Sequence, residues 1–526
     1  MRKLRKSNRS RKARWRTKQQ RAAFIRNPFQ AAKDLLSKKV STPLAIDKET
    51  LDKNLKESLS DPMKGIPIEL LSDHPEAPPL LSEMSNKSFR ETDYTNILSS
   101  RRNGSKPGPN GIPYKVYKKC PRLQEFLWTI ILYCQRKAFV PIQWKVSFTS
   151  FIPKVDKPDP SNFGDYRSIA LLNVEGKLFF SLVSKRLVAH VVHNNKFINT
   201  SVQKGCMEKV PGCVDHISMV WDALSDAKIN KKSLSIIWLD IANAYGSIPH
   251  HLIFLALRRY GIHDDYIKLL KSYYNDLNSR SVSDSAPSSW HSHERGIFAG
   301  CTVSVILFLC GMNLLLEYIL LSDARPFINS AQISLSLCRA LMDDLSLMTE
   351  ETSCAEKLLR RSCTAIGWGR MAFRADKLRS FVLVHGRPVN KVHFNIPDPV
   401  TGIPSPISSI FSKPIRFLGR LVEHTLSDAR RLDEIRKGIK EALRSFDKSH
   451  HFGKNKVWML QKYLNHKIRW PFIIFEVPLS FATEMQGTIS GYVRKWLGLH
   501  PNIATPSLYS DNSPCPLPLS SLETIP

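Results

Sequence analysis

The spacing of apolar and polar positions predicts a run of helices and short strands from about residue 90 onward. Apolar residues at helical spacing indicate amphipathic helices, whereas short apolar runs indicate buried strands. The predicted helices cover residues 122–138, 176–193, 215–227 and 251–257, and the predicted strands cover residues 147–153, 234–240, 340–348 and 380–384. Such a mixture of elements is typical of the α+β class, which is the fold class that we expect.

The longest apolar run, residues 305–321, predicts a buried helix. It is interrupted by Asn313 and Glu317 and is shorter than the about 20 residues that a membrane span needs. The basic N-terminus has no apolar stretch after it, so we expect no secretory signal. The ten cysteines form no Cys-x-x-Cys pair, which favours free thiols in a reducing compartment. We therefore expect a nuclear or cytoplasmic protein that is neither secreted nor in a membrane.

Charge and composition divide the chain into five stretches. Residues 1–40 hold 15 Lys/Arg and one Asp, and residues 41–100 hold 6 Lys/Arg and 11 Asp/Glu. We expect a basic N-terminal extension, an acidic Pro/Ser-rich linker, a main folded part, a helical and basic part, and a Pro/Ser-rich tail. Their predicted bounds are 1–40, 41–90, 91–425, 426–500 and 501–526. The extension could be a nucleic-acid arm, a nuclear import signal or a solvated tail.

The net charge of the whole chain is +31, with a pI near 9.8. Because residues 1–40 contribute +14 and residues 41–100 contribute −5, the rest of the chain carries +22. A surface this positive attracts polyanions, and nucleic acid is the commonest of them.

Three aspartates stand where sheet elements end. Asp240 closes the apolar run of the strand predicted at 234–240, and Asp343 and Asp344 lie between apolar residues in a predicted hairpin. Acids crowded together repel unless cations lie between them. Carboxylate oxygens suit Mg²⁺, and two such ions about 4 Å apart are used by polymerases for phosphoryl transfer. We expect two Mg²⁺ ions here, with Mn²⁺ as a possible substitute.

Eight short blocks, in this order, resemble the reverse transcriptases of non-LTR (LINE-like) retrotransposons. They are residues 106–113 (KPGPNGIP), 152–154 with 165–172 (IPK and DYRSIALL), 240–245 (DIANAY), 296–304 (GIFAGCTVS), 341–344 (LMDD), 373–380 (FRADKLRS), 416–419 (RFLG) and 494–499 (RKWLGL). The resemblance implies a right-hand architecture, with fingers and palm in residues 91–425 and the thumb in 426–500. It also implies an RNA-directed DNA polymerase, a nucleotidyltransferase that extends a primer 3′ end with dNTPs, with an RNA template and a DNA primer or target DNA as partners.

The same resemblance implies roles for individual residues. Asp240, Asp343 and Asp344 would bind the metal ions, together with the backbone carbonyl of Ile241, and Lys377 would give a proton to the leaving pyrophosphate. The positions that would bind the incoming nucleotide and the base pair are Lys154, Arg167, Ile241, Tyr245 and Gly300. The positions that would grip the primer are Phe417, Leu418 and Gly419.

Two other readings stay open. One is a catalytically dead retroelement relic that only binds nucleic acid, and the other is a protein similar to group II intron maturases. The intact aspartates argue against the first, and the block at 494–499 argues against the second. Many related elements encode a nuclease or a Cys/His cluster outside the polymerase, so we expect the chain to be a fragment that works with other retroelement-encoded domains, or else a decayed copy.

Overall fold

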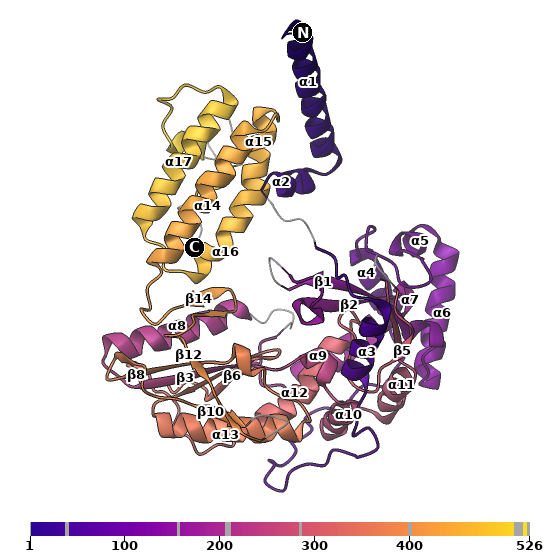
Figure 1. Cartoon of the computed structure of the whole chain (residues 1–526). Coiled ribbons are helices and arrows are strands. Elements are labelled where there is room, and N and C mark those ends of the chain that lie inside the picture. Colours follow the sequence, from indigo (N-terminus) through magenta and orange to yellow (C-terminus); the bar gives the residue numbers. More distant parts are fainter. Residues whose placement is uncertain are drawn as a thin grey trace. The chain divides into compact units, whose positions relative to one another are not determined.

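Two compact units make up the chain in this computed structural model (Figure 1). The structure describes residues 2–36, 42–154, 158–205, 212–282, 287–397, 402–509 and 519–522. Unit 1 combines Met1–Val40 with Pro414–Pro526, and unit 2 is Ser41–Lys413. Helices and sheets are both present, and most strand pairs are antiparallel, which confirms the predicted α+β class.

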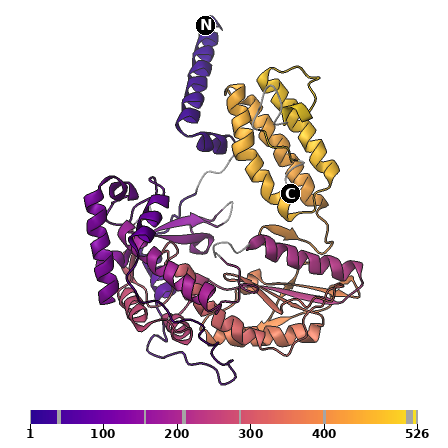
Figure 2. The ribbon, with the colours of Figure 1, turned by 180° about the vertical axis from the view of Figure 1, so that it is seen from behind.

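A six-stranded sheet lies at the centre of the second half of unit 2. Its strand order is β12-β8-β3-β7-β6, and β9 pairs with β8. The strands are β3 (Leu234–Asp240), β6 (Cys338–Leu341), β7 (Asp344–Thr349), β8 (Arg379–Val384), β9 (Arg387–Val389) and β12 (Ser408–Ser409). Helices α8 (Cys213–Ile229) and α13 (Thr352–Trp368) cover opposite faces of this sheet (Figures 1 and 2).

The buried position of β3 explains its composition. A strand covered on both faces has no solvent side, so a continuous apolar run replaces the usual alternation. Residues 234–239 are all buried, and only Asp240 at the end is partly exposed. The central strand therefore delivers its one carboxylate to the edge of the core.

A second, four-stranded sheet has the order β2-β1-β4-β5. Its strands are β1 (Val146–Pro153), β2 (Tyr166–Leu172), β4 (Asn278–Ser281) and β5 (His291–Ser292). The helices of this half are α4 (Glu91–Ser100), α5 (Tyr114–Lys119), α6 (Pro121–Lys137), α7 (Val174–Val188) with a π-turn at Ala189–Asn194, α9 (Ala244–Ser247), α10 (His250–Arg259) and α11 (Asp264–Asn275). Short 3₁₀ turns lie at Ile142–Trp144 and Phe163–Asp165.

Helix α12 (Ser304–Leu320) is the buried helix that the longest apolar run predicts. Its polar residues are satisfied inside the core, because Asn313 Nδ2 donates to Glu317 Oε1 over 2.8 Å and Tyr260 Oη donates to the same oxygen over 2.8 Å. Arg259 pairs with the second carboxylate oxygen of Glu317 at 3.2 Å. In the described ranges, no helix combines the length and the apolar character that a bilayer crossing requires.

Residues 42–90 differ from the linker that their composition predicts. They contain α3 (Lys48–Leu59), whose Leu51, Leu55 and Leu59 are buried, and Phe89 farther along joins the main core. Leucines four residues apart form one apolar stripe on a helix. This stripe packs with Tyr166 of β2 inside unit 2, although the stretch is rich in proline, serine and acids.

Unit 1 is mainly helical. The C-terminal part has the hairpin β13 (Ile415–Phe417) and β14 (Arg420–Val422), then α14 (Ala429–Lys448), α15 (Gly453–Met459), a π-turn at Leu460–Leu464, α16 (Asn465–Ile474), α17 (Leu479–Leu497) and a 3₁₀ turn at Pro506–Leu508. The N-terminal helices α1 (Arg2–Arg26) and α2 (Pro28–Leu36) belong to the same unit. Its C-terminal segment thus starts at Pro414, twelve residues before the boundary predicted at 426.

The remaining elements of unit 2 are short. A two-stranded ribbon joins β10 (Asn395–Pro397) to β11 (Pro404–Pro406), and a 3₁₀ turn lies at Ala375–Lys377, just before β8. This turn brings a lysine to the carboxyl end of β3.

Candidate active site

The three predicted aspartates lie at one end of the central sheet. Strands β3 and β7 are antiparallel neighbours, and their register places Asp240 directly opposite Asp344. Strand β6 ends at Leu341 and β7 begins at Asp344, so Met342 and Asp343 form the two-residue turn between them. The fold therefore gathers carboxylates that are 103 residues apart in sequence.

Gln203 holds this turn, and its contribution was not recognised in the sequence. Its amide is fully buried; Oε1 accepts the Met342 N–H over 2.9 Å, and Nε2 donates to the Met342 carbonyl over 3.1 Å. Met342 has φ +61°, a conformation that is costly for a residue with a side chain. Both backbone polar groups of the strained residue are thus fixed by one side chain.

Gly205 completes the support. Its N–H also donates to Gln203 Oε1, over 2.9 Å, and a Cβ at Gly205 would lie 2.5 Å from Met342 Sδ. Backbone bonds join Lys204 and Val202 to Ala340 on β6. Segment 202–205 therefore supports the hairpin through contacts with residues that are more than 130 positions away in sequence.

Burial and repulsion between carboxylates disfavour the charged forms of Asp343 and Asp344. Burial is the main cause that raises the pKa of Asp344, to about 6, and the charges of Asp343 and Asp240 add to it. Burial also raises the pKa of Asp343, where the charge of Asp240 acts in the same direction. The positive charges of Lys377 and Arg167 oppose these shifts. Such a group of carboxylates gains stability from any cation that comes between them.

Lys377 lies against Asp240 in the structure. Its Nζ is 3.0 Å from Asp240 Oδ2, and the turn that carries it is fixed because the Arg374 N–H donates to the Asp240 carbonyl over 2.8 Å. Ile241 forms an isolated antiparallel bridge with Phe373. Two segments that are far apart in sequence are thereby joined at the carboxyl end of β3, and Ile241 is placed beside the aspartates.

Lys154 and Arg167 lie at the ends of the paired strands β1 and β2. Arg167 is exposed on β2 and pairs in register with Ile152 of β1. Lys154 Nζ donates to the Gly164 carbonyl over 3.0 Å. Desolvation lowers the pKa of Lys154, and the charges of Arg374, Lys377 and Arg167 lower it further. The structure thus brings a group of cations close to the aspartates.

Tyr245 and Gly300 have clear structural surroundings. Tyr245 follows β3 by five residues, and its ring packs against Phe308 of α12 at 4.9 Å. Gly300 has φ +126°, and a Cβ there would lie 2.5 Å from the Ala170 carbonyl oxygen on β2. The Ala170 N–H of β2 donates to the Ala299 carbonyl over 2.7 Å, and this close approach to β2 requires a glycine at position 300. Contacts of either residue with a nucleotide stay a prediction.

The predicted primer-grip residues lie in unit 1. Phe417 ends β13, and Leu418 and Gly419 form the turn before β14 with φ +48° and +101°. A Cβ at Gly419 would lie 3.0 Å from Trp470 Nε1. The structure groups this hairpin with the helices of unit 1, whereas the sequence placed it in the preceding domain.

The donor chemistry of the site fits a divalent metal ion, although the neighbouring carboxylates do not form a complete set of side-chain ligands. Among the described residues, no three His, Cys, Asp or Glu side chains are arranged as a cluster that could hold an ion. The fit rests instead on Asp343 and Asp344, whose pKa values are raised first by burial and then by neighbouring carboxylates. Hard oxygen donors of this kind suit Mg²⁺ and Mn²⁺. Lys377 contacts only Oδ2 of Asp240.

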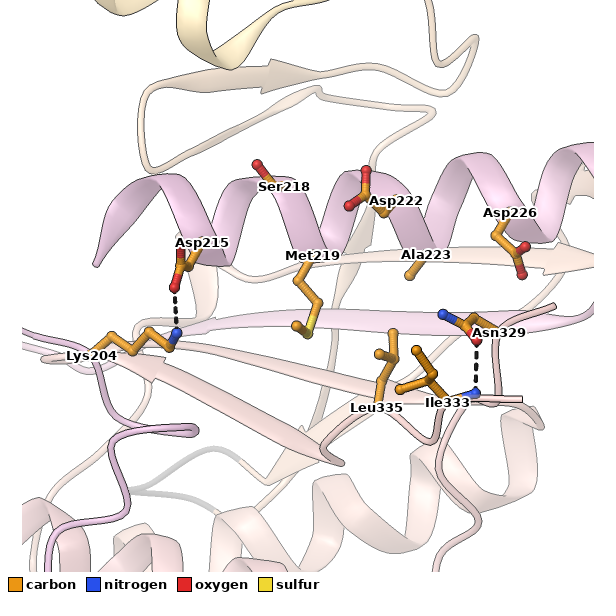
Figure 3. Close-up of a pocket in the computed structure, with 10 residues that line it drawn as sticks. All are labelled: Lys204, Asp215, Ser218, Met219, Asp222, Ala223, Asp226, Asn329, Ile333 and Leu335. Atoms are coloured by element: carbon orange, nitrogen blue, oxygen red, sulfur yellow. Dashed lines mark hydrogen bonds and ion pairs between the residues drawn. The ribbon is translucent and has the colours of Figure 1, made fainter. Parts of the chain in front are cut away.

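A cavity of about 480 Å³ lies elsewhere, along α8 (Figure 3). It is lined by Lys204, Asp215, Ser218, Met219, Asp222, Ala223, Asp226, Asn329, Ile333 and Leu335. Lys204 and Asp215 are joined by an ion pair of 2.5 Å across one end of it. None of the predicted site residues lines this cavity, so it is separate from the aspartate site.

Comparison with known proteins identifies a family. The profile of the family "Reverse transcriptase (RNA-dependent DNA polymerase)" matches residues 152–422, just over half of the chain. The chain is 26% identical over 289 residues to the Retrovirus-related Pol polyprotein from type-2 retrotransposable element R2DM of Drosophila melanogaster, covering 55% of this chain and 26% of that protein. It is 25% identical over 232 residues to the Probable RNA-directed DNA polymerase from transposon X-element of the same organism, covering 44% of this chain and 25% of that protein.

A likeness among solved structures is weaker. Apo telomerase from Candida tropicalis aligns over 67% of this chain and 62% of its own, at 11% identity and a TM-score of 0.34, which adds nothing to the assignment. The matched stretch spans about a quarter of the length of the two fly proteins. Family profile and relatives confirm the predicted resemblance to non-LTR retrotransposon enzymes, and with it the right-hand fold of the family. The chain belongs to the reverse transcriptase family.

Proposed function

We propose that this chain is an RNA-directed DNA polymerase that extends a primer 3′ end with dNTPs on an RNA template, with a role in retrotransposition. The observation that carries this proposal is the pairing of Asp240 with Asp344 across β3 and β7, with Asp343 in the adjoining turn. These acids face the positive charges of Arg167 and Lys377. A site with both signs of charge suits a triphosphate and its accompanying cations, because the basic residues attract the phosphates and the acidic residues attract the cations.

The chain's own residues have separate tasks in this reaction. Asp240, Asp343, Asp344 and the Ile241 carbonyl would hold two Mg²⁺ ions, or Mn²⁺ in their place. When bound, such ions lower the pKa of the primer 3′-hydroxyl and stabilise charge on the triphosphate.

Substrate binding and selection use the remaining positions. Lys154 and Arg167 would bind the triphosphate oxygens through charge-assisted hydrogen bonds. Lys377, released from Asp240, would hold a proton for the leaving pyrophosphate. The ring of Tyr245 would leave no room for a 2′-hydroxyl and so favour deoxynucleotides. Gly300 would line the base pair, and Phe417, Leu418 and Gly419 would contact the primer strand.

The proposed partners are nucleic acids and other retroelement products. The template is RNA and the primer is DNA or a nicked target DNA, and further domains supply any nuclease activity. The cysteines of the described ranges are free thiols, which supports action in the reducing nucleus or cytoplasm.

Primer extension tests this proposal directly. The purified chain, an RNA template with an annealed DNA primer, dNTPs and Mg²⁺ should give full-length DNA. Asp343→Asn should abolish the product while RNA binding, measured by fluorescence anisotropy, stays within about threefold. If both proteins bind RNA but neither synthesises DNA, the polymerase proposal is wrong and the chain is a relic that only binds nucleic acid.

A further inference from the structure

The basic helix α1 is a feature that the polymerase site does not use. Residues 2–26 carry twelve Lys/Arg and no acidic residue. The described cations on its exposed surface are Arg11, Lys12, Arg14, Arg16, Lys18 and Arg26. Within the part of the chain whose side chains are described, none of these six is paired with a carboxylate. The helix thus presents a concentration of positive charge that the protein itself does not neutralise.

The C-terminal end of α1 is anchored to unit 1. The Phe24 ring is buried and meets Trp458 edge-on at 5.5 Å and His451 at 5.4 Å. The Arg21 guanidinium lies 3.7 Å from the centroid of the Phe452 ring, and its Nε donates to the His450 carbonyl over 3.1 Å.

Further contacts extend this anchor on both sides. The His450 N–H donates to Gln20 Oε1 over 3.1 Å. On the following helix α2, the Phe29 ring lies 5.0 Å from Trp458, and Ala31 and Ala32 are buried. Helix α1 is therefore a fixed part of unit 1 and not a loose tail.

The anchored face and the charged faces of α1 are different. At 100° per residue, Thr17, Gln20, Arg21 and Phe24 form one stripe, and these four are the least exposed residues of the described part of the helix. The six unpaired cations occupy the rest of the circumference. Docking therefore leaves the positive charge turned toward solvent.

An exposed aromatic ring lies within this charged surface. Trp15 is 60% exposed. Arg11 and Lys12 lie one turn before it and Lys18 one turn after it, so all three are its neighbours on the helix surface. Cations beside an exposed aromatic ring are the combination that binds a polynucleotide, because phosphates meet the cations while a base stacks on the ring.

We propose that α1 is a polynucleotide-binding arm of unit 1, in which the exposed cations contact phosphates and Trp15 stacks on an unpaired base. The preferred ligand is single-stranded RNA or DNA. An anionic membrane is disfavoured because a membrane-surface helix needs a continuous free apolar face, whereas the Phe24 ring of α1 is packed against Trp458 and His451. This arm goes beyond the proposed polymerase and binds whether or not that activity exists.

Salt-dependent binding of the full chain tests the charges. The probe is a fluorescent, unstructured 20-nucleotide RNA, and the variant combines Arg11→Gln, Arg16→Gln and Lys18→Gln. Each phosphate contact contributes about 0.7 to the slope of log K against log salt on single strands, so the slope should fall by about 2. Between 50 and 200 mM salt, the wild type should then lose about 20-fold more affinity than the variant.

A matched control removes three charges elsewhere. Lys231, Arg387 and Lys391 are exposed and lie toward the end of the central sheet opposite to Asp240. Their replacement by Gln should leave the slope as in the wild type. If the α1 variant and this control show the same slope and affinity, the arm does not bind RNA and the proposal is wrong.

Trp15→Leu provides a second, independent readout. Loss of one stacked base should weaken binding of the single strand about tenfold, with an unchanged salt slope and little effect on a blunt-ended duplex. Equal affinity of wild type and Trp15→Leu for the single strand would refute the stacking role. Binding to phosphatidylserine vesicles that is tighter than to RNA, and lost in the charge variant, would overturn the choice of ligand.

Discussion

Replacing Gln203 by Leu should separate the geometry of the catalytic hairpin from the stability of the fold. The substitution leaves the N–H groups of Met342 and Gly205 and the Met342 carbonyl without their partner. Each buried polar group left unpaired costs about 1–3 kcal/mol. The left-handed backbone of Met342 at φ +61° adds about 1–2 kcal/mol that the amide no longer offsets.

These terms favour a relaxed turn by several kcal/mol, so Asp343 and Asp344 should move. A displacement of about 1 Å in a catalytic group costs roughly 100-fold in rate. We therefore expect Gln203→Leu to lower the rate of single-nucleotide incorporation by about 10- to 100-fold. RNA affinity, which uses other surfaces, should change by less than about threefold.

Gln135→Leu is the matched control. Gln135 is also buried in unit 2, where it accepts the Phe89 N–H over 2.9 Å and donates to the Lys87 carbonyl over 3.0 Å. Both variants should lower the free energy of unfolding by similar amounts in urea titrations, but only Gln203→Leu should slow incorporation. Equal incorporation rates for the two folded variants would refute the idea that Gln203 positions the aspartates.

Three further predictions concern stability. Gly300→Ala should lower the free energy of unfolding by about 2–3 kcal/mol, because the new Cβ meets backbone at a positive φ, whereas Gly367→Ala in open space on α13 should raise it slightly in the same urea titration. Asp428→Ala removes the 2.7 Å ion-pair partner of the buried Arg420 and should lower the free energy of unfolding by about 3–5 kcal/mol. The double variant Arg420→Met with Asp428→Leu should recover much of this loss. No recovery would contradict burial of an uncompensated charge as the cause. Burial, followed by the charge of a neighbouring arginine, lowers the pKa of His216 to about 4. Below about pH 6.5 the unfolded chain takes up this proton and the folded chain does not, so the free energy of unfolding should fall by about 1.4 kcal/mol per pH unit as the pH falls toward 4. A His216→Gln protein with the same acid dependence as the wild type would exclude this histidine as a cause.

The sequence predicts those elements whose signal is local. Strand β3 was predicted with its observed bounds because both of its faces are buried and its apolar run is continuous. The hairpin around Asp343 and the buried helix α12 follow from equally local patterns. The order of the short blocks then identified the family, which the family profile confirms.

Local patterns do not predict interactions between residues that are distant in sequence. The leucine stripe of α3 was hidden in an acidic, proline-rich stretch, and it has meaning only beside the surface that it covers. Gln203 contacts a residue 139 positions away, so no local pattern predicts its role. The anchoring of Phe24 on Trp458, more than 400 residues later, joins the two ends of the chain in one unit.

Single-nucleotide incorporation on an RNA template tests the central claim most directly. Wild type, Asp343→Asn and Asp376→Asn should be compared at equal RNA occupancy with Mg²⁺ and one dNTP. Asp376 is a nearby carboxylate that pairs with Arg374 and lies on the same turn as Lys377. We predict rapid incorporation by the wild type and by Asp376→Asn, and a loss of at least about 1000-fold in Asp343→Asn, the scale on which electrostatic transition-state stabilisation is lost. Incorporation by Asp343→Asn at the wild-type rate would contradict the assignment of the aspartate hairpin as the catalytic centre.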